Sequence, residues 1–152
     1  MKALIIYDSV YGNTEKVAKA IAGAIAPPHE VRVLRAAEAK PSELGPFDLL
    51  VVGSPTHGGR QVPAIRDFLD KVPGPSVKGV KVAAFDTRTS SKVSRIFGHA
   101  AGRIAHGLEQ KGGVLAVPAE GFFVDGSKGP LKEGELERSA AWAKKVLETV
   151  KK

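Results

Sequence analysis

The sequence predicts an α/β protein: a three-layer, doubly wound fold around a five-stranded parallel sheet. Short apolar runs alternate along the chain with longer stretches of helical periodicity, a pattern typical of parallel strands joined by crossover helices on both sheet faces. The chain has 152 residues, of which 43% are hydrophobic and 26% are charged, and no repeat or low-complexity tract divides it. These properties predict one compact domain spanning residues 1–152.

Each element is predicted from its hydrophobic pattern. Runs in which nearly every residue is apolar predict strands buried on both faces, and alternating polar and apolar residues predict an edge strand. Apolar residues at helical spacing predict the helices. In chain order, the expected elements are a strand at 2–7, a helix at 13–26, an edge strand at 30–34, a strand at 47–52, a helix at 60–72, a strand at 80–85, a helix at 92–111, a strand at 114–117 and a closing helix with an apolar stripe of Leu136, Ala140, Ala143, Leu147 and Val150.

Two further expectations concern the ends of this series. The helix that should follow the edge strand at 30–34 is degenerate or missing, because no helical stripe precedes the next strand. Phe122 and Phe123 are expected at the end of the last strand, and Trp142 on the closing helix. We expect all three aromatic side chains to lie in the core and not at a cofactor.

Several classes of function are excluded or disfavoured by what the sequence lacks. There is no cysteine, which excludes disulfides, iron–sulfur clusters, zinc–thiolate sites and a cysteine nucleophile. The G-x-x-x-x-G-K-[ST] motif of P-loop NTPases is absent, and no G-x-G-x-x-G follows the first strand. A phosphorelay receiver would need an acceptor Asp after the third strand, where this chain has Gly53-Ser54.

The charge and hydropathy patterns predict the partners and surroundings of the protein. There are 23 Lys and Arg against 16 Asp and Glu, and the net charge of +7 favours acidic partner proteins without indicating nucleic acid. No apolar run is long enough to cross a membrane, and the N-terminal run is too short for a signal peptide. We therefore expect a cytoplasmic protein without membrane insertion, as a monomer or weak dimer.

Ligands of open parallel sheets bind beyond the carboxyl ends of the strands, here the loops 8–14, 54–60 and 86–91. In the first loop, Gly12 lets backbone amides converge, and the following helix directs the positive end of its dipole at the same point. Ser9 and Thr14 add hydroxyl donors, and Asn13 is suited to cap the helix. The loop is thus predicted to be either a phosphate cradle of neutral donors or a strand-to-helix turn without a ligand.

The residues of these loops resemble those of one protein family. The run Ile5-Ile6-Tyr7-x-Ser9-x-x-Gly12-x-Thr14-x-x-x-Ala18-x-x-Ile21 resembles the signature with which flavodoxins bind flavin mononucleotide (FMN). Segments 53–59 and 85–88 resemble the second and third loops of the same family, and the similarity extends along essentially the whole chain. By length the chain resembles the short-chain group. The resemblance implies the flavodoxin-like strand order 2-1-3-4-5 and FMN as the cofactor.

The resemblance also implies which residues bind the cofactor. The phosphate is expected at Ser9, Val10, Tyr11, Gly12, Asn13 and Thr14, and the flavin ring at Ser54, Pro55, Thr56, His57, Gly58 and Gly59 of the second loop and Asp86, Thr87 and Arg88 of the third. The chain contains no nucleophile–base pair, no paired carboxylates and no metal-ligand spacing, so we expect no catalytic residue and no metal.

The chain departs from the family at the positions that would stack on the ring. His57 stands where many flavodoxins carry a larger aromatic residue, and the third loop contains no aromatic residue at 86–91. Either Arg88 packs its guanidinium plane on the flavin, or that face stays open to solvent or substrate. With Arg60 and Arg88 beside the ring, the anionic reduced flavin should be favoured, giving a less reducing low-potential couple than acidic flavodoxins show.

Three functions remain open at this point. The first is an FMN-binding electron-transfer protein that carries electrons between a reductase and an acceptor protein. The second is an FMN-dependent NAD(P)H/quinone-type oxidoreductase, for which an uncovered ring face would leave room for a substrate. The third is an interaction domain that keeps the fold without binding flavin. A one-electron carrier is the leading interpretation, and stepwise reduction of the protein with added FMN distinguishes the three.

Overall fold

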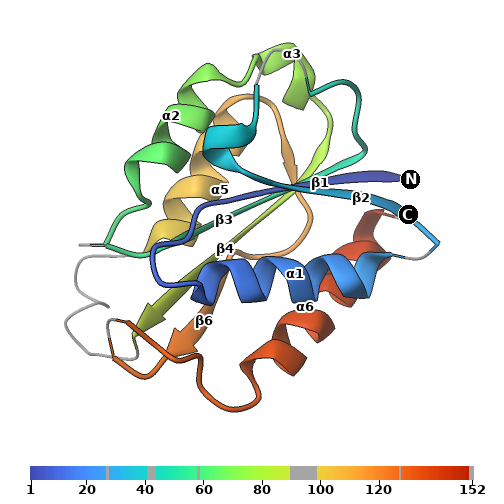
Figure 1. Ribbon diagram of the computed structural model, residues 1–152. Helices are drawn as coiled ribbons and strands as arrows, with labels where there is room; N and C mark the ends of the chain where they lie inside the picture. The colour runs from blue at the N-terminus through green and yellow to red at the C-terminus, as the bar shows by residue number, and fades with distance from the viewer. Residues whose placement is uncertain (27, 41–43, 58, 90–98, 127, 151–152) are drawn as a thin grey trace.

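The computed structural model describes residues 1–26, 28–40, 44–57, 59–89, 99–126 and 128–150. One parallel sheet lies between two layers of helices (Figure 1). Its strands are β1 (Lys2–Tyr7), β2 (Glu30–Arg35), β3 (Leu49–Pro55), β4 (Lys81–Thr89), β5 (Val114–Leu115) and β6 (Glu120–Val124). The helices are α1 (Asn13–Ile25), the 3-10 turn η1 (Ala36–Glu38), α2 (Pro63–Lys71), α3 (Gly74–Val77), α5 (Ala100–Gln110) and α6 (Glu135–Val150).

The strand order is β2-β1-β3-β4-β5, which confirms the predicted 2-1-3-4-5 arrangement. The fifth position is filled by two short strands instead of one. β5 pairs with the start of β4 at Lys81 and Val82, and β6 pairs with its last five residues, Phe85 to Thr89. Pro118 lies between these two strands and cannot donate to a strand ladder, so the predicted strand at 114–117 ends early and pairing resumes at Glu120.

The core is divided into two parts by the sheet. Helices α2 and α5 cover one face, and α1 and α6 cover the other (Figure 1). Side chains of β1 alternate between them: Leu4 and Ile6 pack on the α2–α5 side, and Ile5 packs on the α1–α6 side. Both faces of β1 are therefore buried, as its continuous apolar run predicts.

The α1–α6 side of the core contains a cluster of aromatic rings. Phe85, Phe122 and Trp142 meet edge to face with ring centroids 6.1 to 6.2 Å apart. The predicted core role is confirmed for Phe122 and Trp142, which are buried. Phe123 is only half-buried, and the Arg138 guanidinium lies near both rings, 4.6 Å from the centre of Phe122 and 5.6 Å from that of Phe123.

Several boundaries differ from the predictions. α2 begins at Pro63, three residues later than expected, because Arg60 pairs with His57 through two backbone hydrogen bonds instead of entering the helix. Leu136 is exposed instead of buried, because α6 turns Ser139 and Trp142 toward the sheet. The first residues of the predicted helix at 92–111 lie outside the described part of the chain. Within the described residues, no helix has the length and hydropathy to cross a membrane.

Candidate functional site

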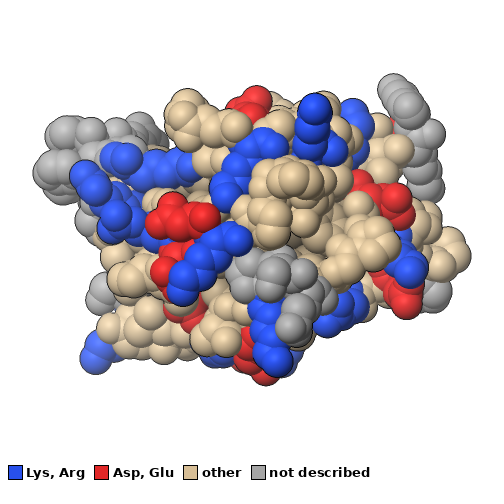
Figure 2. All heavy atoms as spheres, turned by 90° about the horizontal axis from the view of Figure 1, so that it is seen from above, with Lys and Arg blue, Asp and Glu red and all other residues tan. Residues whose placement is uncertain are grey.

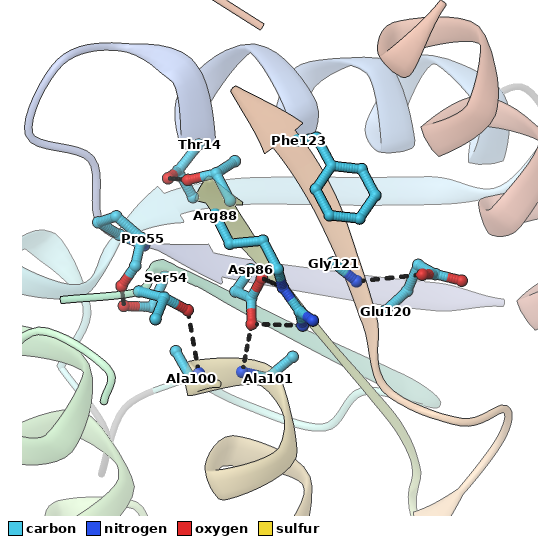
Figure 3. A network of polar contacts seen from close by, with 12 residues as sticks. Thr14, Ser54, Pro55, Asp86, Arg88, Ala100, Ala101, Glu120, Gly121 and Phe123 are labelled. Carbon is cyan, nitrogen blue, oxygen red and sulfur yellow. Dashed lines mark hydrogen bonds and ion pairs between the residues drawn. The ribbon is translucent and has the colours of Figure 1, made fainter. Parts of the chain in front are cut away.

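The three predicted loops meet at the carboxyl ends of β1, β3 and β4 (Figure 3). The Thr14 and Thr87 hydroxyl oxygens lie 2.8 Å apart and share a hydrogen bond, although 73 residues separate them in sequence. The Asp8 N–H donates to the Gly53 carbonyl at 3.2 Å, and the Thr56 N–H donates to the Thr87 carbonyl at 2.9 Å. The loops therefore form one polar edge, as the rule for parallel sheets predicts.

The first loop presents backbone donors at the start of α1. Gly12 has φ +90°, a left-handed conformation that other residues rarely adopt, and its N–H donates to the Ser9 hydroxyl at 2.9 Å. The first helical bond is from the Lys16 N–H to the Gly12 carbonyl at 3.1 Å. In the described part of the chain, no acceptor takes the N–H groups of Asn13, Thr14 and Glu15. Three donors and the helix dipole are thus directed at the loop.

The prediction that Asn13 caps α1 is wrong. Gly12 occupies the cap position and no side chain caps the helix. The Asn13 amide instead donates to the Lys128 carbonyl at 3.1 Å. A side chain at Gly129 would lie 2.5 Å from the Asn13 Nδ2 atom, so glycine there allows this close approach. This contact joins the first loop to the segment after β6, which sequence patterns alone did not connect.

Three charged side chains beside the first loop, those of Asp8, Glu15 and Arg35, are already paired. The Arg35 guanidinium donates to the Asp8 carboxylate at 2.9 Å and to the Ser9 carbonyl at 3.0 Å. Tyr7 donates to Glu15 at 2.7 Å. Burial and this hydrogen bond raise the pKa of Tyr7, while the bond lowers the pKa of Glu15. The loop donors that the described residues leave open are therefore backbone amides.

The remaining residues of the first loop point outward. Val10 and Tyr11 are each 51% exposed. The Lys128 ammonium lies 6.0 Å from the centre of the Tyr11 ring, in a cation–π contact. An exposed apolar pair beside open donors is a surface that an aromatic ligand would cover.

The second loop is held by side-chain hydrogen bonds of Ser54 and Thr56. Ser54 is buried, accepts the Val62 N–H at 3.0 Å and donates to the Pro55 carbonyl at 2.8 Å. Its hydroxyl is thus used within the protein, so any hydrogen bond to a flavin from this residue would require that bond to break. The Thr56 hydroxyl accepts the first N–H of α5, from Ala100, at 3.0 Å.

The tip of the second loop is closed by backbone hydrogen bonds. His57 and Arg60 exchange N–H to carbonyl bonds at 2.9 and 3.1 Å, and the His57 side chain is exposed. Gly59 is buried, and its carbonyl accepts the Arg103 guanidinium at 3.0 Å. Gly58, which the sequence also assigns to the cofactor, lies outside the described residues.

The predicted third loop is the end of a strand. β4 continues to Thr89, because β3 pairs with it on one side up to Thr87 and β6 on the other up to Thr89. Asp86 is completely buried and binds Arg88 through two hydrogen bonds of 2.7 and 2.8 Å (Figure 3). The Asp86 carboxylate also accepts the Ala101 N–H of α5 at 2.9 Å. The polar run at 86–91 predicts a loop, but these partners keep its described residues, Asp86 to Thr89, in the sheet.

Arg88 is enclosed as well as paired. Its side chain is 17% exposed, and a side chain at Gly121 would overlap its guanidinium at 2.1 Å. Stacking of Arg88 on a flavin would therefore require it to leave the Asp86 ion pair. Arg60, the other arginine expected beside the ring, differs from Arg88: it is exposed and has no carboxylate partner among the described residues.

Comparison with known proteins identifies the family. The sequence profile of the family described as Flavodoxin matches residues 5–142. This chain belongs to the flavodoxin family. A flavodoxin from the domain Archaea superposes on all of this chain and over its own full length, with a TM-score of 0.83 and 25% identity. Flavodoxin 2 from Bacillus cereus has a TM-score of 0.81 and 25% identity, over 97% of this chain and 99% of its own.

Curated relatives of this flavodoxin-family chain carry another name. Proteins described as NAD(P)H dehydrogenase (quinone) from Brucella anthropi and Gluconacetobacter diazotrophicus are each 31% identical. The matches cover 54% and 60% of this chain, and 52% and 58% of the two relatives. The chain thus spans little more than half the length of these relatives.

FMN is the cofactor of flavodoxins, and the first loop of this family member fits its phosphate. The fit rests on the open N–H groups of Asn13, Thr14 and Glu15 and on the Ser9 hydroxyl, whose oxygen accepts a bond and whose hydrogen remains to be donated. Neutral donors at a helix N-terminus are a common arrangement for binding phosphate. The places of the individual residues around the flavin ring remain predictions.

Proposed function

We propose that this flavodoxin-family chain binds FMN at the carboxyl edge of its sheet and carries electrons between a reductase and an acceptor protein. The observation that carries the proposal is that the described residues supply no acceptor for the N–H groups of Asn13, Thr14 and Glu15, beyond a left-handed Gly12. FMN, when bound, supplies the electron-accepting chemistry. The protein residues bind and orient the cofactor.

The phosphate end is the part that this chain prepares in advance. Gly12 fixes the direction of the helix start, and the Ser9 hydroxyl is held by the Gly12 N–H. Thr14 is held in turn by Thr87. Because these donors are ordered before the ligand binds, less conformational entropy is lost on binding.

Titration with FMN and with riboflavin, which lacks the phosphate, tests the phosphate site. We expect FMN to bind at least about tenfold more tightly, because hydrogen bonds to a charged group are worth roughly 1.5–3 kcal/mol each. Ser9→Ala should weaken FMN binding and leave riboflavin binding nearly unchanged. Ser76→Ala, a change of the same size in helix α3, is the matched control. Equal affinity for the two flavins would contradict the assignment of the phosphate loop.

A second function, an FMN-dependent NAD(P)H:quinone oxidoreductase, is favoured by the description of the curated relatives. Stepwise reduction of the FMN-loaded protein distinguishes the two. A carrier should be reduced in two separable one-electron stages and turn over NADPH with a quinone slowly or not at all. Direct two-electron turnover without a separate reductase would favour the enzyme. A protein that takes up no FMN would overturn both.

The potential of the second electron is a further expectation. With a net charge of +7, the protein should stabilise the reduced anion relative to a flavodoxin with an acidic surface. Since Arg88 is neutralised by Asp86, Arg60 is the arginine of this pair expected to contribute. In a redox titration, Arg60→Gln should make the second potential more negative. An unchanged or less negative potential would contradict the electrostatic argument.

A further inference from the structure

A basic hollow lies between helices α2 and α5, beside the backbone hydrogen bonds that join His57 and Arg60. Its volume is about 430 Å³. Its lining includes Arg60, Arg66, Gly102, Arg103, His106 and Gly107, and we call this hollow the arginine groove. None of its described lining residues is acidic. Figure 2 views the molecule from the α2–α3 side and shows Lys and Arg side chains gathered toward the left end of that face, with Asp and Glu beside them.

The charges of the groove are available to a partner. Arg60, Arg66, Arg103 and His106 are all exposed, and within the described residues no carboxylate forms an ion pair with them. The Arg103 Nε atom donates to the Gly59 carbonyl, and the guanidinium has further N–H groups to donate. Three other arginines of the described residues, Arg35, Arg88 and Arg138, do form ion pairs with carboxylates. The groove thus brings together three arginines that lack such a partner among the described residues.

Two glycines keep the floor of the groove open. Gly102 and Gly107 lie within helix α5, where glycine is less favourable than alanine. A Cβ atom at Gly102 would meet nothing within 4 Å, and one at Gly107 would make an ordinary 3.7 Å contact with Leu69. The fold would accept a side chain at both positions. What the glycines provide is space between the arginines.

We propose that the arginine groove docks an acidic segment of the redox partner protein. This proposal rests on the electron-transfer function proposed above and identifies the surface at which the partner binds. Arg60 closes the turn that begins at His57, and Arg103 contacts that turn at Gly59. A partner held there lies next to the predicted flavin loop. The groove is open and its cations come from two helices and a turn, which suits several carboxylates on a protein surface better than one enclosed phosphate.

The experiment is an NMR titration of the ¹⁵N-labelled, full-length, FMN-loaded protein with a hexaglutamate peptide at low salt. The amide signals of Gly102 and Gly107 report on the groove itself. We expect both signals to shift, and Arg66→Glu to weaken the peptide affinity about fivefold or more. The matched control is Lys145→Glu, the same change in charge at an exposed site of α6, which should weaken binding less than about twofold.

A second variant keeps the test independent of Arg66. Gly102→Glu places a carboxylate in the groove and should abolish the shift at Gly107, whereas Gly102→Ala should leave peptide affinity within about twofold because its Cβ has room. Circular dichroism confirms that each variant is folded. If Arg66→Glu and Lys145→Glu weakened the peptide affinity equally, the net charge of the protein and not the groove would account for binding, and the proposal would be overturned. Shifts caused by inorganic pyrophosphate but not by the peptide would overturn it in favour of a phosphate ligand.

Failure of the proposed function is distinguished by FMN uptake in the same samples. If the protein binds FMN and the peptide leaves Gly102 and Gly107 unshifted, the docking proposal alone fails. If the protein takes up no FMN, the titration is made on the protein as purified. Shifts at the groove would then support the acidic docking site while the electron-transfer function is overturned.

Discussion

The two ends of the polar edge of the sheet are built in opposite ways. At the end of β1, the N–H groups of Asn13, Thr14 and Glu15 are left without acceptors by the described residues. At the end of β4, the Asp86 carboxylate is buried with Arg88 and the Ala101 N–H, so its hydrogen-bonding capacity is used within the protein. Polar groups at the end of β1 therefore remain available to a ligand, and we call this the open end. Those at the end of β4 are satisfied within the protein, and we call this the closed end.

The difference indicates which part of the edge is prepared for a ligand. Buried polar groups need hydrogen-bond partners, so the role of the closed end is structural: it holds β4 and the start of α5 together. We propose that the open end keeps its donors for a dianionic phosphate. The following predictions test this contrast, in order of decreasing expected effect.

The largest expected effect is at the closed end. Asp86→Ala leaves the Arg88 guanidinium enclosed without its partner and the Ala101 N–H without an acceptor. We expect the free energy of unfolding, measured by urea denaturation, to fall by about 3–5 kcal/mol. The double variant Asp86→Ala/Arg88→Met should be less destabilised than the single one. If the single variant lost less than about 1 kcal/mol, the closed end would not be a scaffold.

An intermediate effect is expected at the open end. Gly12→Ala places a side chain at φ +90° and should lower the free energy of unfolding by about 1–2 kcal/mol, while FMN binding weakens because the amides turn away. Gly23→Ala in the same helix is the matched control. Its Cβ atom would meet nothing within 4 Å, so this variant should be more stable by up to about 1 kcal/mol. Urea denaturation that gave both variants the same sign would contradict the special role of Gly12.

The smallest expected effect depends on pH and concerns another closed cluster, at the start of α6. The Glu135 carboxylate accepts the Phe123 N–H at 2.8 Å and Arg138 at 2.7 and 3.0 Å, and the Arg138 bonds lower the pKa of Glu135 below its ordinary value of 4.5. A lowered pKa in the folded state stabilises the protein above pH 4.5, and this contribution is lost as the pH falls through the folded-state pKa.

Glu135→Gln should therefore cost about 1 kcal/mol at pH 7 and less at pH 3, so the urea midpoints of variant and wild type converge on acidification. Glu137→Gln, at an exposed position of the same helix, should keep the acid dependence of the wild type. A constant difference between Glu135→Gln and the wild type from pH 7 to pH 3 would show that the ion pair does not set this dependence.

Local patterns predicted most of the elements and the first loop. Strand-sized apolar runs and helical stripes are set by neighbouring residues, so they predict β1 and α1 correctly, whereas the strand order was implied by the family resemblance. The left-handed Gly12 is also a local property, since it depends on the conformation of one residue. The Asn13 cap was wrong because the amide found its acceptor at Lys128, far along the chain.

The sequence by itself determined the alternation of strands and helices, the net charge and the glycine that opens the first loop, because each is a property of a residue or of its near neighbours. Only the tertiary structure decided that β4 continues to Thr89, that Arg88 pairs with Asp86, and that arginines of α2, α5 and an adjoining turn border one groove. These features depend on which polar groups find partners across the sheet and between helices, and such partners lie far apart in sequence.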